Sequence, residues 1–394
     1  MRQLFALVAI LISLTGCQTM SKTPRAEASG DNRLTNSPDM VDRLIFIESA
    51  ADWRRGKRER VAVEGAKLVL ADSRNRAFPR RGRFDSQEIA ADFPFTEVVP
   101  SWNAVATPDS GMTFQVRTRD ARSGEWSPWL YMGQWGRTPH YPGRTLDFKH
   151  GEVNVDYLKL TRPANALQVR ADLYSFDLSQ STTPTLTRMA IAYAGRVKKA
   201  SDRKELTKPV VIEGDWARSL DIPYLAQGDL NPAISGSTCS PSSITMSMAY
   251  WGVNRPLEQN ALDIYDREYG IFGNWARSAA LPGQLGLRSY VRRFRNWDQV
   301  KAEIAKGNPM CASIRFGKGE FPSNVLKSTN GHLIVIRGFT PSGDVIVNDP
   351  ASRARGDGIV YKADELARAW FDKGGVGYVI AGPEEPVASR RRGG

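Results

Sequence analysis

Cysteine and histidine are both scarce in this chain. Among 394 residues there are three of each. They are Cys17, Cys239 and Cys311, and His140, His150 and His332. No pair of them stands at the short spacing of metal ligands, so we expect no bound metal. No glycine-rich phosphate loop occurs either, which excludes ATP-driven transport and leaves no expected cofactor.

Long apolar runs are absent beyond the first residues, so no internal segment is expected to span a membrane. Arg2 precedes an apolar stretch over residues 4–14, which is typical of a signal peptide. The sequence LTGC at 14–17 resembles a bacterial lipobox, which implies cleavage before Cys17 and a lipid anchor on that residue. Gln18 after it favours the outer membrane, facing the periplasm, by the Gram-negative sorting pattern. The alternative is an ordinary secretory signal that happens to contain a cysteine.

Negative charge is in the minority, because 42 Asp and Glu stand against 54 Lys and Arg, for a formal net charge of +12. In an exported protein we do not expect nucleic acid as a partner. The positive charge instead favours contact with anionic lipid head groups or cell-wall polymers. Basic residues cluster over 54–60 and 74–83. A solvated basic face without a partner is the simpler interpretation of both clusters.

The length of the chain exceeds what one hydrophobic core usually serves, which predicts two folded domains. Changes in composition indicate the boundaries. We expect a signal peptide (1–16), a polar tether (17–42), a first domain (43–197), a charged linker (198–218), a second domain (219–384) and a basic tail (385–394).

Residues 44–194 have the pattern of short strands separated by turns. Eight candidate strands occur, and residues 114–118 alternate between apolar and polar side chains. This pattern predicts an antiparallel β-sandwich. The aromatic-rich segment 126–135 either packs in its core, which we favour, or stacks on sugar rings. His140 and His150 stand alone and are expected to be surface or packing residues.

Cys239 has the sequence context of a reactive thiol. It follows the small, polar stretch 236–238, and apolar residues over 244–251 then recur at the spacing of an amphipathic helix. Ser240 suits the N-cap of that helix and Pro241 suits its first turn. Cys239 is therefore expected at a helix N-terminus, where free N–H groups and the helix dipole favour a thiolate.

A thiolate nucleophile needs a base, and His332 is the single histidine of the second domain. It lies in an apolar strand (331–338), and a second apolar run follows at 345–347, which predicts a hairpin with its turn at 340–341. That register places His332 opposite Asp349, with Cβ atoms roughly 5 Å apart. Asp349 would then orient the imidazole, although a slip of one residue would turn it to the other face.

Two further residues belong to the predicted site or lie near it. Gln227 lies twelve residues before Cys239, and its side-chain amide and the N–H of Cys239 would together stabilise an oxyanion. Cys311 lies in an apolar stretch without an acid or base beside it, and we expect it to be buried packing. A disulfide between Cys239 and Cys311 is the alternative, and it would remove the nucleophile.

These motifs resemble the peptidase C39-like family. The resemblance is carried by Pro223, Tyr224 and Gln227, CSPSS at 239–243, AYWG at 249–252, GH at 331–332 and NDP at 348–350. It extends over roughly residues 220–380 and implies an α+β papain-like cysteine peptidase fold, in which a helix with the cysteine packs on an antiparallel sheet with the histidine and aspartate.

The resemblance also implies a role for each residue of the site. Cys239 would be the nucleophile, and His332 the general base and acid. Asp349 would orient the imidazole, and Gln227 would be the oxyanion donor. Ser240 stands where the family usually has glycine, and its side chain is expected to narrow the mouth of the site.

Together with the export signal, these features predict an envelope-anchored cysteine peptidase or amidase that acts on a peptide or protein substrate. A catalytically inactive binding or scaffolding lipoprotein with the same fold is the second hypothesis. Acyl transfer is the third, because the same residues serve it when an amine rather than water reaches the acyl-enzyme.

Overall fold

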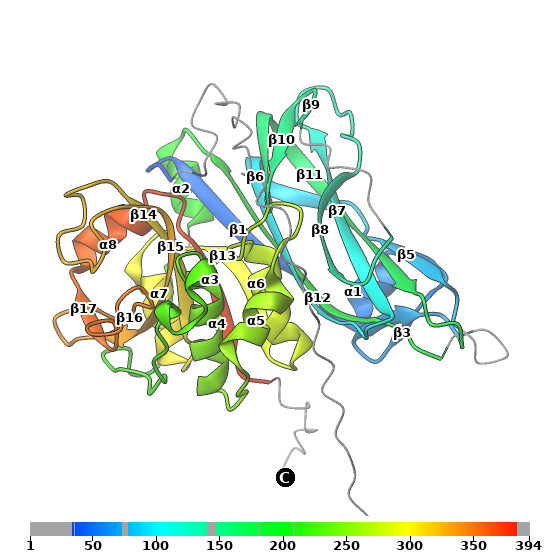
Figure 1. Cartoon of the computed structure of the whole chain (residues 1–394). Coiled ribbons are helices and arrows are strands. Elements are labelled where there is room, and N and C mark those ends of the chain that lie inside the picture. Colours follow the sequence, from blue (N-terminus) through cyan, green and yellow to red (C-terminus); the bar gives the residue numbers. More distant parts are fainter. Residues whose placement is uncertain are drawn as a thin grey trace, which may run out of the picture. The chain divides into compact units, whose positions relative to one another are not determined.

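The computed structural model describes residues 34, 36–72, 78–139, 147–179, 181–207 and 209–383. Cys17, the predicted signal peptide, His140 and the basic tail lie outside the described residues. Two domains with separate sheets follow one another along the chain, and both belong to one compact unit over residues 33–394 (Figure 1). No helix in the described part of the chain is long and apolar enough to cross a membrane.

The described residues of the first domain form twelve strands and two short helices. The strands are β1 (Met40–Ile47), β2 (Lys57–Glu59), β3 (Val61–Glu64), β4 (Lys67–Leu70), β5 (Arg81–Asp85), β6 (Ile89–Val105), β7 (Ser110–Asp120), β8 (Leu130–Gly136), β9 (Asp147–Phe148), β10 (Gly151–Asn154), β11 (Tyr157–Ser175) and β12 (Thr185–Arg196). The helices are α1 (Ala50–Arg55) and α2 (Ala200–Leu206).

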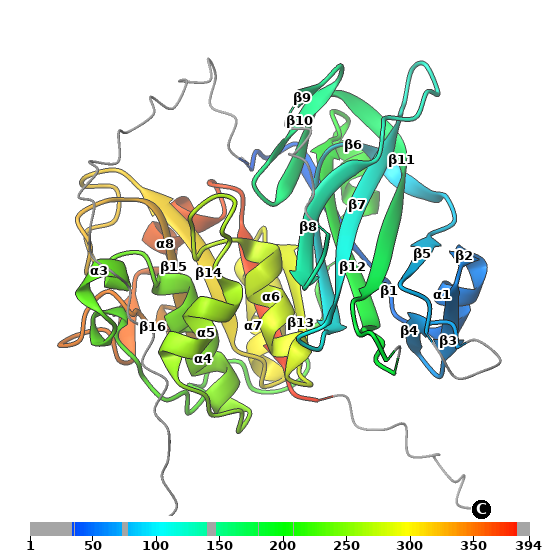
Figure 2. The ribbon, with the colours of Figure 1, turned by 45° about the vertical axis from the view of Figure 1, so that its right-hand side comes forward.

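The strands form one connected sheet rather than the two separate sheets of a sandwich. The sheet runs β2-β5-β11-β6-β12-β4-β3, and the other strands pair off this path. Two long strands make the connection, since β6 (17 residues) and β11 (19 residues) change partners along their course, and β11 carries bulges. The predicted antiparallel β-sandwich is therefore confirmed in part. The pairings are antiparallel, but the sheet curves toward a barrel (Figure 2).

The aromatic-rich segment 126–135 packs within the first domain. Most of its second half is buried. The half-buried rings of Trp126 and Trp129 lie beneath arginine side chains: the Cζ of Arg117 is 4.8 and 4.6 Å from the two ring centroids, and that of Arg170 is 4.0 Å from Trp129. Guanidinium groups thus occupy positions over these rings that a stacked sugar would need, and the packing interpretation fits better.

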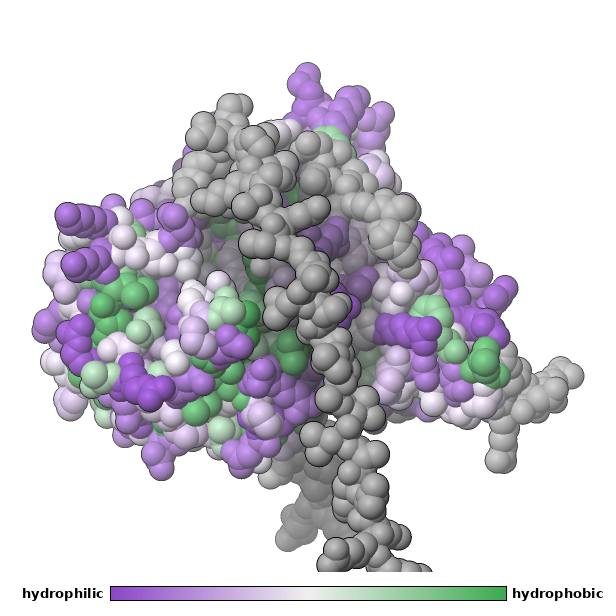
Figure 3. Space-filling view, viewed as in Figure 1, coloured by the Kyte–Doolittle hydropathy of each residue, from purple (hydrophilic) through white to green (hydrophobic). Residues whose placement is uncertain are grey.

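The described basic residues of the two clusters, over 54–60 and 80–83, lie along one edge of the first domain. β2 pairs with β5, which places Arg58 opposite Phe84. Asp172 forms ion pairs with Arg81 (3.1 Å) and Arg83 (2.8 Å) and so neutralises part of this charge. Hydrophilic residues gather at the end of the domain that carries α1, β3 and β5 (Figure 3). The edge is a charged surface in part paired with its own carboxylates.

The described residues of the second domain form a sheet of six antiparallel strands, in the order β13-β18-β14-β15-β16-β17, and six α-helices. The strands are β13 (Arg288–Arg293), β14 (Met310–Phe316), β15 (Thr329–Phe339), β16 (Val345–Asn348), β17 (Ile359–Tyr361) and β18 (Val376–Ala381). The helices are α3 (Pro232–Ser235), α4 (Cys239–Tyr250), α5 (Leu257–Ile264), α6 (Trp275–Gln284), α7 (Trp297–Ala305) and α8 (Ala363–Trp370), with a 3-10 turn at Gln227–Asp229.

Helices cover both faces of this sheet. On β18, Tyr378 points toward α4, where its hydroxyl lies 3.4 Å from the Oγ of Ser240. The neighbouring Gly377 faces the other way, because a Cβ at this glycine would meet the Trp370 ring of α8 at 3.2 Å. α4 therefore lies on one face and α8 on the other (Figure 2). This layering presses α4 against β15, the strand that carries His332.

Side chains of β6 take the place of a neighbouring strand along the free edge of β13. The Asn103 carboxamide accepts from the N–H of Ser289 (3.2 Å) and donates to its carbonyl (2.8 Å). The Ser101 hydroxyl accepts from the N–H of Val291 (3.0 Å). Asn103 and Ser101 are buried, and a buried edge needs partners for its backbone groups. The first domain thus completes the sheet edge of the second.

Candidate active site

Cys239 is the first residue of α4. The N-cap is Thr238, whose side chain makes no capping hydrogen bond. The prediction of Ser240 as N-cap is wrong, because Ser240 is the second helical residue. The first N–H groups of a helix have no carbonyl partner within it, so the sulfur lies at the positive end of the helix dipole.

α4 is buried along most of its length, which differs from the predicted amphipathic helix. Residues 240–248 are all buried. Serine side chains fit there because they donate to carbonyl oxygens one turn earlier, as from Ser242 to Thr238 (2.9 Å) and from Ser247 to Ser243 (3.0 Å). The apolar residues seen in the sequence thus occupy one side of a helix that is buried on its other sides as well.

His332 faces the thiol from β15. Its backbone pairs with Ile314 of β14, and its side chain is buried. The ring lies close enough to Cys239 for the two groups to shift each other's pKa, and its Nε2 lies 2.7 Å from the Oδ1 of Asp349. Nδ1 is therefore the nitrogen that faces the sulfur. The structure brings Cys239, His332 and Asp349 together, with the imidazole ring between the other two groups.

Asp349 reaches His332 by a different route from the predicted hairpin register. The turn over 340–344 is longer than expected, and Val335 pairs with Asn348. β16 ends at Asn348, so Asp349 follows the strand and is not paired with His332. The predicted register is therefore wrong, although the two side chains do meet.

Hydrogen bonds within the segment after β16 orient the Asp349 carboxylate. Its own N–H donates to the carbonyl of Gly356 (2.8 Å), which fixes the backbone. Oδ1 accepts from the N–H of Ala351 (3.0 Å) as well as from His332. Oδ2 accepts from the hydroxyl of Tyr361 (2.6 Å). Both oxygens are thus held in place, and Oδ1 is aimed at the imidazole.

The site lowers the pKa of the Cys239 thiol and raises that of the His332 imidazole. Burial would raise the pKa of the Cys239 thiol, but the hydrogen bond and charge of His332 lower it, with help from the backbone N–H groups of Leu333 and Ser240. Burial would lower the pKa of His332, but the Asp349 charge and the contact with Cys239 raise it to about 10. The two shifts support each other as a coupled pair.

Gln227 lies in the 3-10 turn that precedes α3. Its backbone N–H donates to the carbonyl of Pro350 (2.9 Å), which ties this turn to the residue after Asp349. Its Nε2 donates to the carbonyl of Ser235 (2.9 Å), and its Oε1 is buried without a hydrogen-bond partner among the described residues. One N–H of the amide is left over for an oxyanion. These contacts bring Gln227 to the loop before Cys239 rather than to Cys239 itself.

The side chain of Ser240 points away from the mouth of the site. It is 0% exposed, and its Oγ lies 2.9 Å from the Oγ of Ser278 on α6 and 3.4 Å from the hydroxyl of Tyr378. Ser278 donates its own proton to the carbonyl of Asn274 (2.8 Å), so Ser240 is the donor in the bond between the two serines. The expectation that Ser240 narrows the mouth is therefore wrong. The hydroxyl ties the first turn of α4 to α6.

The sequence does not reveal the contacts that three polar side chains make around Asp349. Tyr361 donates to its carboxylate, and the hydroxyl of Tyr224 donates to the carbonyls of Asp349 (3.0 Å) and Ser352 (2.6 Å). The side-chain oxygen of Asn348 accepts from the N–H of Gly358 (3.0 Å). Tyr224 and Asn348 stand within the recognised motifs, which is a signal for them. Tyr361 stands in no motif.

Cys239 and Cys311 are both free thiols. Cys311 is buried on β14, with its sulfur 3.6 Å from the Oγ of Ser247, and burial raises its pKa to about 12. Cys311 is thus a packing residue, and the two sulfurs are not joined. Within the described ranges, no group of three or more His, Cys, Asp or Glu side chains could hold a metal ion.

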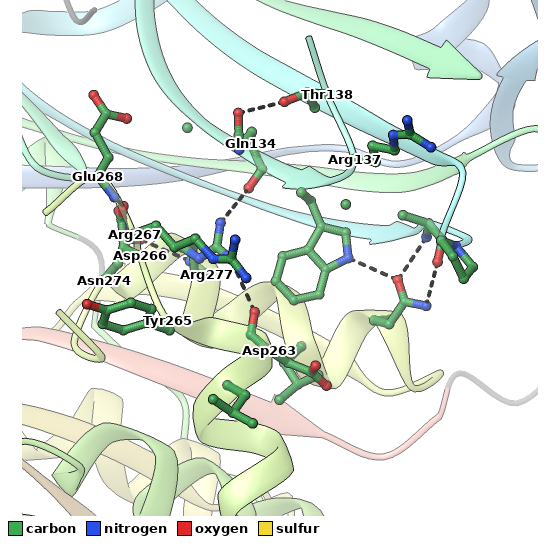
Figure 4. Close-up of a pocket in the computed structure, with 18 of the residues that line it drawn as sticks. Gln134, Arg137, Thr138, Asp263, Tyr265, Asp266, Arg267, Glu268, Asn274 and Arg277 are labelled. Carbon is green, nitrogen blue, oxygen red and sulfur yellow. Dashed lines mark hydrogen bonds between the residues drawn. The ribbon is translucent and has the colours of Figure 1, made fainter. Parts of the chain in front are cut away.

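A cavity of about 1100 Å³ lies where α5 and α6 meet β8, and none of Cys239, His332 and Asp349 lines it. Figure 4 shows hydrogen bonds among some of its polar residues, such as those of Gln134 with Thr138 and with Arg277. Arg277 donates to the carbonyls of Asp263 (3.1 Å) and Gln134 (3.3 Å). The cavity is thus lined by both domains, and Arg277 of the second domain is hydrogen-bonded to Gln134 of the first.

A cysteine at a helix N-terminus, an imidazole on the facing sheet and a carboxylate behind the ring form the kind of arrangement expected of a cysteine peptidase. A family model described as Peptidase_C39 like family matches residues 219–378, and one described as Peptidase C39 N-terminal domain matches residues 44–194. The second domain is a peptidase C39-like domain, which confirms the resemblance drawn from the motifs.

Similar solved structures are distant. One is that of a C39-like peptidase from Bacillus anthracis (14% identity, TM-score 0.33, covering 42% of this chain and 96% of that one). Others are the enzymatically active domain of bacteriophage CBA120 tailspike protein 4 (11%, 0.18, 41% and 20%) and carbohydrate-binding modules of the β-sandwich superfamily (13%, 0.17, 42% and 61%). These scores are too low to indicate how this chain works. A search of curated protein sequences found no match.

Proposed function

We propose that the protein is a cysteine peptidase or amidase of the bacterial cell envelope that hydrolyses peptide bonds. One observation carries the proposal: Cys239, at the start of α4, interacts with a buried His332 whose ring is hydrogen-bonded to Asp349. The family of the second domain supports the same class of reaction.

In the proposed reaction, the Cys239 thiolate attacks the carbonyl carbon and the carbonyl oxygen becomes an oxyanion. The N–H of Cys239 and the Gln227 amide donate to that oxyanion. The His332 imidazolium then protonates the leaving nitrogen, the C–N bond breaks, and an acyl-enzyme thioester remains. Water gives a proton to the neutral imidazole and attacks the thioester, which releases the acid and restores the thiolate and imidazolium. Asp349 stays ionised throughout.

Alkylation with an iodoacetamide probe at pH 6.5 tests the activated pair. Because the pKa of Cys239 is lowered and that of Cys311 is raised to about 12, wild-type protein should be labelled at Cys239 and not at Cys311. His332→Ala should slow labelling of Cys239 by roughly tenfold, since a thiol near its ordinary pKa is mostly protonated at this pH. Peptide mapping by mass spectrometry measures both sites. His150→Ala is the matched control, and equal rates in wild type and His332→Ala would rule out the pair.

A catalytically inactive binding or scaffolding lipoprotein is the second candidate. It is favoured by the position of Gln227, whose side-chain amide is bonded to Ser235 in the loop before Cys239 and not to Cys239 itself. Cys239→Ala would abolish the cellular phenotype of a peptidase and would leave that of a scaffold unchanged. Acyl transfer would be recognised by its product, because an added amine would appear in an amide bond in place of water.

We further propose that a lipid on Cys17 holds the protein on the outer membrane, facing the periplasm, and that its basic residues add contact with anionic lipid or cell-wall polymers. The apolar stretch before LTGC at 14–17 and the net charge of +12 support this. In membrane fractions, detergent but not concentrated salt should release the wild type, and Cys17→Ser should be soluble. Release of the wild type by salt alone would mean that charge, which salt screens, holds the protein.

A further inference from the structure

A tyrosine hydroxyl completes the hydrogen bonding of Asp349. Tyr361, the last residue of β17, donates to Oδ2 at 2.6 Å, and both residues are 0% exposed. Water therefore does not compete for this bond. The other oxygen, Oδ1, is the one that meets His332. The two oxygens of one carboxylate thus serve two partners, a phenol and an imidazole.

The protonation states of the two groups suit this bond. Burial would raise the pKa of Asp349, but the charge of His332 and the hydrogen bonds from His332 and Tyr361 lower it, so the carboxylate stays ionised. Burial and the Asp349 charge raise the pKa of Tyr361 far above its usual value, so the phenol keeps its proton. The phenol is therefore a permanent donor and the carboxylate a permanent acceptor near neutral pH.

Packing holds the Tyr361 ring in place. Its backbone pairs with Val345 of β16. The ring of Phe321 meets it edge to face, with centroids 5.0 Å apart, and the N–H of Val325 lies 3.4 Å from the hydroxyl. The donor is thus fixed before any substrate binds.

We propose that Tyr361 is a positioning residue of the site, which acts through Asp349 on His332 and touches no substrate. The inference rests on the proposed thiol chemistry. Without the hydroxyl, Oδ2 would be a buried oxygen without a donor, the carboxylate could rotate, and its pKa would rise. A carboxylate that takes up a proton no longer stabilises the imidazolium. The thiolate of Cys239 would therefore be lost at a higher pH than in the wild type.

The test measures the rate of Cys239 alkylation by iodoacetamide against pH in the full-length protein. Tyr361→Phe keeps the ring and should move the acidic limb of the profile upward by about one pH unit. Tyr193→Phe is the matched control, because Tyr193 is also buried and its hydroxyl accepts from the N–H of Asp92 (3.2 Å) in the first domain. Its profile should equal that of the wild type.

A second substitution tests the same bond in the opposite direction. 3-Fluorotyrosine at position 361 has a more acidic phenol, donates more strongly and should move the limb of Cys239 alkylation to lower pH. Opposed shifts in the two variants would establish the positioning role, because a merely structural role changes thermal stability and not the limb.

The outcomes separate this inference from the proposed function. An unchanged limb in both Tyr361 variants, with an activated wild type, would overturn the inference and leave the proposed function intact. A wild type in which Cys239 reacts only at the pH of an ordinary thiol would overturn the proposed function, and the inference with it.

Discussion

Cys239 and Cys311 carry the same thiol in the same domain, yet their surroundings move its pKa in opposite directions. Burial raises the pKa at both sites. At Cys239 an imidazole and two backbone N–H groups outweigh it, whereas Cys311 has a serine hydroxyl within reach. The opposite directions of the two pKa shifts therefore follow from the different partners of the two sulfurs.

His332 has a similar dependence on its neighbours. A buried histidine without partners would be neutral, because burial lowers its pKa. Here Asp349 on one nitrogen and Cys239 on the other raise the pKa to about 10. The imidazolium is thus favoured below that value and is lost as the pH rises through it. At neutral pH the ring can therefore hold the proton that the leaving group of a peptide needs.

At the scale of elements, α4 depends on α6 for the position of its first turn. The hydroxyl of Ser240 donates to Ser278, and α4 has no side-chain N-cap that would otherwise fix this end. The N–H of Ser240 is also one of the groups that lower the pKa of Cys239. A single buried hydroxyl thus links the packing of two helices to the state of the thiol.

Substitution of Ser240 should weaken the fold without opening the site. Ser240→Ala should lower the free energy of unfolding by about 1 kcal/mol, since one buried hydrogen bond is lost. Ser240→Gly should cost roughly 1 kcal/mol more, because glycine is more flexible in the unfolded chain. Urea unfolding measures both, with the exposed Ser201→Ala as control. Faster alkylation of Cys239 in Ser240→Gly would show that the side chain obstructs the mouth after all.

The hairpin of β15 and β16 shows how far the sequence predicts the site. Motifs at His332 and Asp349 identify both residues, because a motif records the chemistry directly. The register cannot be read in the same way, since it depends on the length of the turn over 340–344, which composition does not fix. Tyr361 escapes prediction because only the folded path of the chain brings it to Asp349.

The prediction of an amphipathic helix is wrong, and the prediction of an antiparallel sandwich is confirmed in part. α4 was expected to have one apolar face, but residues 240–248 are buried on all sides, and backbone-directed serine hydroxyls make this possible. In the first domain, alternation correctly predicts antiparallel strands. It does not predict that β6 and β11 are long enough to join the layers into one sheet, because alternation records which face a residue takes and not which strand it pairs with.

At the scale of the whole molecule, the contact between the domains consists of buried polar groups as well as apolar ones. Asn103 and Ser101 satisfy the edge of β13, and Arg293 of that strand forms an ion pair with Glu97 of β6. The side chains of Arg293 and Glu97 are 2% and 6% exposed. These bonds cross from one domain to the other, so unfolding of one domain would break them and remove their contribution to the stability of the other. The two domains are therefore expected to unfold together.

Glu97→Ala tests this coupling. Arg293 would keep its hydrogen bond to the carbonyl of Gly374 but lose the buried carboxylate of Glu97, so the free energy of unfolding should fall, by at most about 3 kcal/mol. Asp364→Ala is the control, because Asp364 and its partner Arg368 are 72% and 54% exposed, and an exposed ion pair contributes little to stability. Scanning calorimetry should show one transition in the wild type, shifted as a whole by Glu97→Ala. Two transitions, of which the substitution moves only one, would mean that the domains unfold independently and that the buried pair stabilises a single domain rather than the junction.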